Sequence, residues 1–141
     1  MSNPETEFNA ALSKYHAGND LISVEEDFNK IVSNMPNNFA AWTCLSWLQL
    51  LLKKNEDALN SAKLAVKLNP QDPQARMNLC LGLLATKTKG VRDHVETIKR
   101  MLVLAPDLEE ELKSSIADGF AKYPEWPELK KIQNWIEIEI V

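Results

Sequence analysis

Three prolines recur at nearly equal intervals, and this spacing constrains the fold more than any other feature of the sequence. They end the segments Asn34-Met35-Pro36, Leu68-Asn69-Pro70 and Leu104-Ala105-Pro106, so the spacings are 34 and 36 residues. An apolar run with helical spacing precedes each proline, and a polar residue that can cap a helix follows it. Only 4 of the 141 residues are glycine, which leaves little material for hairpins or phosphate-binding loops. Repeated pairs of helices are therefore predicted.

The middle unit, residues 39–72, resembles a tetratricopeptide repeat at the positions that define that family. The matching residues are Trp42, Leu45, Ser46, Ala58, Ala65, Leu68 and Pro70. Residues 73–108 match less well, because Arg76 stands in place of the tryptophan and two extra residues near Gly90 should lengthen a turn. Residues 5–38 match at fewer positions, which are Phe8, Ala11, Tyr15 and Phe28.

The resemblance implies an all-α fold, a right-handed α-solenoid of antiparallel helix pairs. We expect one domain in residues 1–141, with three repeats followed by capping helices in residues 109–141. Spacing and capping signals predict about eight helices, near 4–17, 23–34, 38–53, 56–68, 73–86, 91–104, 108–122 and 126–139. Ser23 is expected to cap the second helix in a capping box with Glu26, and Asp107 to open the seventh.

In this family the first helix of each pair lines a concave face that holds a segment of another protein. The resemblance therefore implies a protein-interaction adaptor or scaffold with a largely apolar groove, acting in the assembly or regulation of a larger complex. The candidate partner-binding residues, carried over by position, are Asn9, Ser13, Thr43, Trp47, Leu50, Leu51, Met77, Asn78, Leu81 and Leu84. Further concave positions are His16, Ala40, Cys44 and Gln74.

Three alternatives remain open at this point. Leucines at helical spacing are also typical of a core, so the groove leucines can equally be packed inside. The final helix, with Trp126 and Trp135, can fold over the groove and leave nothing to bind. The chain can also be a structural homodimer that associates through its C-terminal helix, where Ile136, Ile138 and Ile140 alternate with polar residues as in a strand, although helical spacing is favoured locally.

The sequence predicts neither catalysis nor a cofactor or metal. His16 and His94 lie in different repeats without the spacing of a metal site or a catalytic triad, and no nucleotide-binding or hydrolase motif occurs. Cys44 and Cys80 stand in helical apolar patterns, which favours small buried residues over a disulfide. One subtype of the family holds acidic chaperone tails in a cationic clamp, but the corresponding positions here are Asn9, Ser13, Cys44, Gln74 and Asn78.

Charge and the absence of long apolar runs limit the partners further. The formal net charge is −4, although residues 53–100 carry 10 Lys and Arg against 5 Asp and Glu. An acidic chain disfavours nonspecific nucleic-acid binding, so we expect protein partners, with the basic middle segment as a possible steering surface. Residues 1–11 are polar and acidic and no 18-residue apolar run follows, which predicts a cytoplasmic protein without membrane insertion. We expect a monomer or a weak homodimer.

Overall fold

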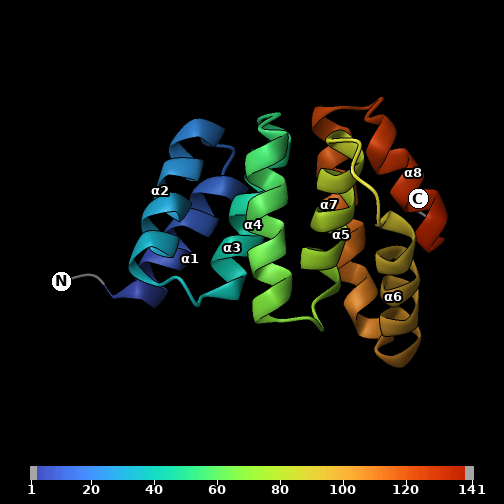
Figure 1. Ribbon diagram of the computed structural model, residues 1–141. Coiled ribbons are helices and arrows are strands. Elements are labelled where there is room, and N and C mark those ends of the chain that lie inside the picture. Colours follow the sequence, from blue (N-terminus) through green and yellow to red (C-terminus); the bar gives the residue numbers. More distant parts are fainter. Residues whose placement is uncertain (1–2, 139–141) are drawn as a thin grey trace.

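The computed structural model describes residues 3–138, and Figure 1 shows pairs of helices stacked in a row. These residues form eight α-helices and one short 3₁₀ helix, so the predicted all-α solenoid is confirmed. The bounds are α1 Pro4–His16, α2 Leu21–Asn34, α3 Phe39–Leu51, α4 Asn55–Leu68, α5 Pro73–Ala85, α6 Val91–Leu104, η1 Pro106–Leu108, α7 Glu109–Lys122 and α8 Pro127–Ile136.

The same proline turn follows α2, α4, α6 and α7. In each turn the residue before the proline leaves the helix with φ between −143° and −131° and ψ between 75° and 88°. The proline ring causes this, because it clashes with a helical conformation at the residue before it. The next helix begins three residues after each of these prolines, which are Pro36, Pro70, Pro106 and Pro124.

The helices α1, α3, α5 and α8 end differently, on a residue in the left-handed region. These residues are Gly18, Lys53, Lys87 and Glu137, with φ of 79°, 64°, 56° and 60°. The next amide then bonds back to the carbonyl five residues earlier; Ile138 N, for example, lies 3.2 Å from Gln133 O. This cap turns Ile138 into the core, where only 3% of it is exposed. Helical spacing therefore holds up to Ile136, while Ile140 lies outside the described residues.

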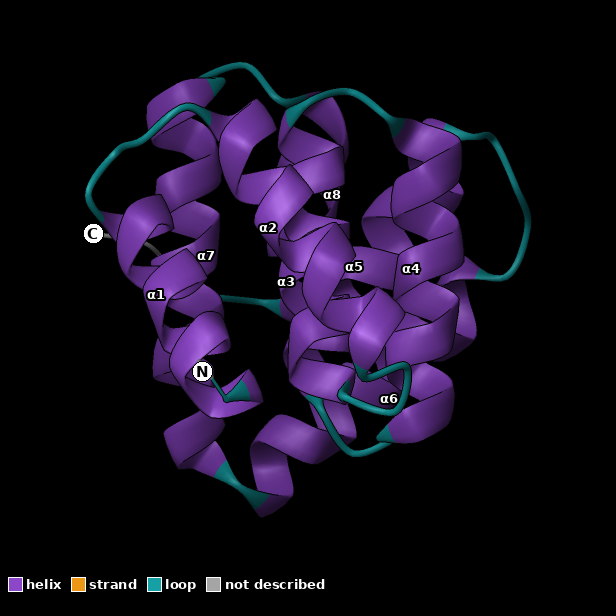
Figure 2. Cartoon of the chain, turned by 90° about the vertical axis from the view of Figure 1, so that its left-hand side faces the viewer, coloured by secondary structure: helices purple, strands orange, loops and turns teal. Residues whose placement is uncertain are grey.

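The stack is continued by α8, although α7 comes first in the chain. Helix α8 packs against α5 and α6, much as α5 packs against α3 and α4. Helices α1 and α7 lie on the same side of the molecule in Figure 2, although Figure 1 shows them apart along the row, and a side-chain contact links them. There Tyr15 Oη donates a hydrogen bond to Asp118 Oδ2 at 3.3 Å, across 103 positions of sequence. The stack thus passes from α5 and α6 to α8, while α7 lies beside the row and reaches α1 through a side chain.

The signature positions of the repeats have identifiable structural roles. Trp42 Nε1 donates to Pro36 O at 2.8 Å, which ties α3 to the turn before it. Arg76 occupies the same position in α5 and donates from Nη2 to Pro70 O, also at 2.8 Å. The arginine therefore keeps the one polar contact that the tryptophan makes. The small residue Ser46 is buried and donates to Ala58 O at 3.0 Å, which lets α3 and α4 approach closely.

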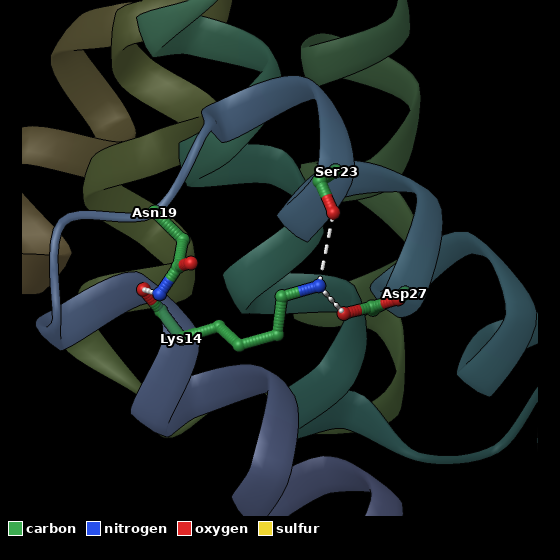
Figure 3. Close-up of polar contacts among 4 residues, drawn as sticks. All are labelled: Lys14, Asn19, Ser23 and Asp27. Carbon is green, nitrogen blue, oxygen red and sulfur yellow. Dashed lines mark hydrogen bonds and ion pairs between the residues drawn. The ribbon is translucent and has the colours of Figure 1, made fainter.

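The start of α2 differs from the prediction. Asp20 is the N-cap residue, accepting a hydrogen bond from the amide of Ile22, and the helix begins at Leu21 instead of after Ser23. Ser23 is used otherwise: its Oγ accepts from Lys14 Nζ at 2.9 Å, and the same ammonium pairs with Asp27 at 2.6 Å (Figure 3). The expected capping box is therefore absent, because the N-cap residue is Asp20, three residues before Ser23.

Two further turns had been predicted, and the structure agrees with one of the two predictions. Asp107 does not cap α7; it lies inside the 3₁₀ helix, and no side chain caps the α7 N-terminus. The extra residues of the third repeat do lengthen a turn, because residues 86–90 separate α5 from α6 while residues 52–54 separate α3 from α4. Gly90 has a φ of 112° there, a conformation that residues with a Cβ rarely adopt.

Candidate functional site

Most of the predicted partner-binding residues are buried, and few of them line an open cavity. Asn9 and Ser13 are exposed on α1, and Leu84 is half-buried. The buried members are Thr43, Trp47, Leu50, Leu51, Met77, Asn78 and Leu81. Five of them, Trp47, Leu50, Leu51, Met77 and Leu81, belong to one apolar cluster together with residues of α7 and α8. Their burial agrees with the alternative that the groove leucines are core residues.

The corner between α7 and α8 covers the end of α3. The rings of Trp126 and Trp47 lie 5.7 Å apart at an angle of 35°. Tyr123 Oη donates to Leu51 O at 2.6 Å, and Lys53 Nζ lies 4.0 Å from the centre of the Tyr123 ring. The end of α3, which carries the candidate residues Trp47 and Leu51, is therefore covered by the chain itself.

Helix α8 uses its apolar face within the chain. Leu129, Ile132 and Ile136 are buried in the same cluster, whereas Trp135 is 45% exposed. Gly119 of α7 allows the close approach, because a Cβ there would lie 2.7 Å from Leu129 Cδ2 and 3.0 Å from the Trp126 ring. Within the described residues the apolar side chains of α8 other than Trp135 are thus packed against their own chain.

An open cavity of about 520 Å³ remains where α1, α3 and α7 meet beside the start of α5. We call this cavity the α1/α3/α7 groove. Its walls are formed by Phe8, Leu12, Tyr15, His16, Phe28, Phe39, Ala40, Thr43, Cys44, Trp47, Leu48, Asp72, Gln74, Glu111, Ser114, Ser115 and Asp118. Thr43 and Trp47 are the predicted partner-binding residues that line it, and the other concave positions His16, Ala40, Cys44 and Gln74 line it as well.

The α7 wall of the groove was missed by the sequence reasoning. It consists of Glu111, Ser114, Ser115 and Asp118. These residues follow the spacing i, i+3, i+4 and i+7, which places them on one helix face. The pattern is visible in the sequence, opposite the buried stripe of Leu112 and Ile116, but nothing local shows that this polar face meets α1.

A chain of side-chain amides runs along the floor of the groove. Asn78 Nδ2 donates to Thr43 O at 3.1 Å, and Gln74 Nε2 donates to Asn78 Oδ1 at 2.9 Å. Both amides are buried, with 6% of Gln74 exposed. The second polar atom of that side chain, Gln74 Oε1, has no hydrogen-bond partner among residues 3–138.

The groove carries acidic groups with little positive charge beside them. Burial raises the pKa of Asp72, and burial together with the charge of Asp72 raises the pKa of Glu111. Burial also raises the pKa of Cys44 to about 12 and that of Tyr15 to about 12. The Tyr15 hydroxyl accepts from Trp47 Nε1 at 3.0 Å while it donates to Asp118.

The described residues contain no cluster of three or more side chains that could hold a metal ion. His94 faces Arg76, with 2.9 Å between Nδ1 and Nη1, and burial and that guanidinium lower the pKa of His94. None of the helices within residues 3–138 has the length and apolar character needed to cross a bilayer.

Comparison with known proteins supports a TPR-like helical solenoid. No family model and no curated protein matches the sequence. Solved structures of MamA share the fold: a crystal structure of MamA has a TM-score of 0.62 at 16% identity, covering 96% of this chain and 77% of that one. The MamA RS-1 ArsTM double mutant gives 0.61 at 17% identity, with coverage of 96% and 74%, and MamA MSR-1 C2 gives 0.59 at 16%, with 96% and 78%. At this identity the likeness concerns the fold.

Proposed function

We propose that this chain is a non-enzymatic protein-interaction scaffold that binds a segment of a partner protein in the α1/α3/α7 groove. The observation that carries the proposal is the cavity of about 520 Å³, which is open to solvent and bounded by first helices of the repeats. We further propose that this binding serves the assembly or regulation of a larger complex in the cytoplasm.

The character of the groove walls supports a peptide ligand. Phe8, Leu12 and Phe39 supply apolar surface, and polar side chains of α7 stand opposite them. Apolar surface with a few placed polar groups is the usual composition of a ligand pocket, because burial supplies affinity and the polar groups fix orientation. Thr43 and Trp47 remain our candidates for contact, whereas the more deeply buried Leu50, Leu51, Met77 and Leu81 would support the floor.

The experiment is a selection from a random 12-residue peptide display library, repeated on two variants. Ala40→Trp places an indole in the cavity, because Ala40 lines it. Ala117→Trp makes the same change at an exposed position of α7 outside the cavity and serves as the matched control. Thermal melts followed by circular dichroism establish that both variants fold.

We expect the selected peptides to bind the wild-type chain and Ala117→Trp equally and to lose at least about tenfold in affinity on Ala40→Trp, which corresponds to about 1.4 kcal/mol. Peptides that bind all three proteins equally would use another surface and would overturn the proposal. A failure to select any peptide would also count against it.

A further inference from the structure

The free oxygen of Gln74 follows from the connections of its amide. A backbone carbonyl can only accept, so the contact with Thr43 O identifies the donating end of Asn78 as Nδ2. The other end, Asn78 Oδ1, must then accept, and Gln74 has to present Nε2 to it. Gln74 Oε1 is therefore left as an acceptor without a donor in the described part of the chain. Gln74 lines the groove, and only 6% of the residue is exposed. A buried acceptor without a donor is destabilising, so this oxygen favours a ligand that donates.

Three carboxylates stand around the same cavity without a cation of their own. They belong to Asp72, Glu111 and Asp118. The ion pairs recorded among residues 3–138 use other carboxylates. Among the groove residues only His16 can become positively charged, and it is an exposed residue. The groove therefore has an excess of negative charge beside its apolar walls.

Two of these carboxylates are already partly removed from water. Burial raises the pKa of both Asp72 and Glu111, and the two charges repel each other. A cation placed between them would relieve this repulsion, and hydrogen bonds from a charged donor to a carboxylate are about twice as strong as neutral ones. Part of the cost of desolvating these two carboxylates is therefore met before a ligand arrives. The net gain in binding free energy from pairing them with a cation is larger than at an open surface.

We propose that the groove takes a lysine or arginine side chain of the partner segment, which donates to Gln74 Oε1 and pairs with Asp72 and Glu111. An apolar residue of the same segment packs on the walls from α1 and α3, where Phe8 and Phe39 lie. The inference rests on the proposed function, since it specifies the chemistry of the partner bound at that site. It also explains why this concave face lacks the cations that would hold an acidic tail.

The first test uses small probes and needs no peptide. 3-Methylbutylguanidinium and its neutral counterpart 3-methylbutylurea have nearly the same shape and differ in charge, and each is titrated into the 15N-labelled chain. We expect the guanidinium to shift the side-chain amide signals of Gln74 and the backbone amide of Thr43, with a dissociation constant about tenfold lower than that of the urea. Equal affinities, or shifts confined to other surfaces, would overturn the inference.

Charge-neutral variants locate the effect. Asp72→Asn removes the charge but keeps a good N-cap for α5, where Asp72 accepts from the amide of Ala75 at 3.3 Å. Glu111→Gln changes an exposed side chain that makes no hydrogen bond or ion pair with the described residues. Together they should abolish the preference for guanidinium over urea. Glu110→Gln, at an 81% exposed side chain outside the groove, is the matched control and should keep that preference.

The second test uses the peptides whose binding is blocked by Ala40→Trp. Each should carry a lysine or arginine whose replacement by glutamine costs about tenfold on the wild-type chain and little on the Asp72→Asn, Glu111→Gln variant. Groove-dependent peptides without such a residue would overturn the inference while leaving the proposed function intact. Guanidinium binding at Gln74 without any groove-dependent peptide would instead overturn the proposed function. The groove would then hold a cation but bind no peptide.

Discussion

Truncation of Trp47 tests whether the α7–α8 corner covers the end of α3. The side chain is 7% exposed, so nearly all of its surface is removed from water. An aromatic side chain buries about 150–250 Å², which at about 25 cal/mol per Å² is worth about 4–6 kcal/mol. Measured aromatic truncations in cores cost about 3–5 kcal/mol. We therefore expect Trp47→Ala to lower the free energy of unfolding by about 3–5 kcal/mol.

Leu81→Ala should act in the same way, because Leu81 is 1% exposed in the same cluster, with a loss of about 2–5 kcal/mol. Trp135→Ala is the matched control: the same chemical change at a side chain that is 45% exposed removes about half as much buried surface and should cost about 2–3 kcal/mol, less than Trp47→Ala. Urea denaturation followed by circular dichroism at 222 nm gives the free energies without depending on tryptophan fluorescence.

Contact between the two rings can be separated from burial. A double-mutant cycle of Trp47→Ala and Trp126→Ala should show a coupling of about 0.5–1.5 kcal/mol, as expected for rings at this separation. If Trp47→Ala and Leu81→Ala each cost less than about 1 kcal/mol, the corner is not docked on α3 and the reasoning from burial fails. The groove would then extend over those residues, as the sequence pattern alone had indicated.

Three other predictions concern single residues. Lys87→Gly should stabilise the chain by about 1 kcal/mol in thermal or urea unfolding, because glycine adopts its φ of 56° without the cost that a Cβ imposes; Lys67→Gly, in the last turn of α4, should destabilise it instead. Asp72→Asn should stabilise the fold at pH 7, and this gain in stability should vanish as pH falls below the ordinary aspartate range. The raised pKa of Asp72 means that the folded chain binds the proton more tightly than the unfolded chain does. Ionisation of Asp72 as pH rises therefore lowers the stability of the wild type. An unchanged difference between pH 3 and pH 7 would contradict this cause. Cys44 and Cys80, whose pKa values burial raises to about 12, should react with a disulfide reagent at pH 8 far more slowly in the native chain than in urea, and rapid native labelling of either would contradict the raised pKa.

Local signals predicted the fold because each repeat contains the residues that begin and end its helices. The prolines force the preceding residue out of the helix, and a polar residue after the proline caps the next helix, as Asn38 does for α3 and Asp72 for α5. Such effects act over a few residues, so they can be recognised without knowing the rest of the chain. The error at Ser23 has the same origin, because two residues near the start of α2 can serve as caps and Asp20 is the one used.

The sequence could not determine the groove to the same degree. Helix α3 is apolar on nearly every side, and its buried residues include Thr43, Trp47 and Leu50, so its pattern does not show which face another helix will cover. The turn at Pro124 has the geometry of the turns at Pro36 and Pro70. The helix after it takes the next place in the stack, whereas α7 stays outside the stack and reaches α1 through the contact of Asp118 with Tyr15.

The sequence by itself thus determined the helices, their pairing and the class of fold, since these depend on spacing, capping and proline geometry between near neighbours. Only the tertiary structure decided that α8 and not α7 continues the stack, that Trp47 meets Trp126, and that Asp72, Glu111 and Gln74 share one cavity. The reason is physical: such contacts join residues as far apart as Tyr15 and Asp118, 103 positions along the chain. They depend on the packing of whole helices, which no short sequence pattern contains.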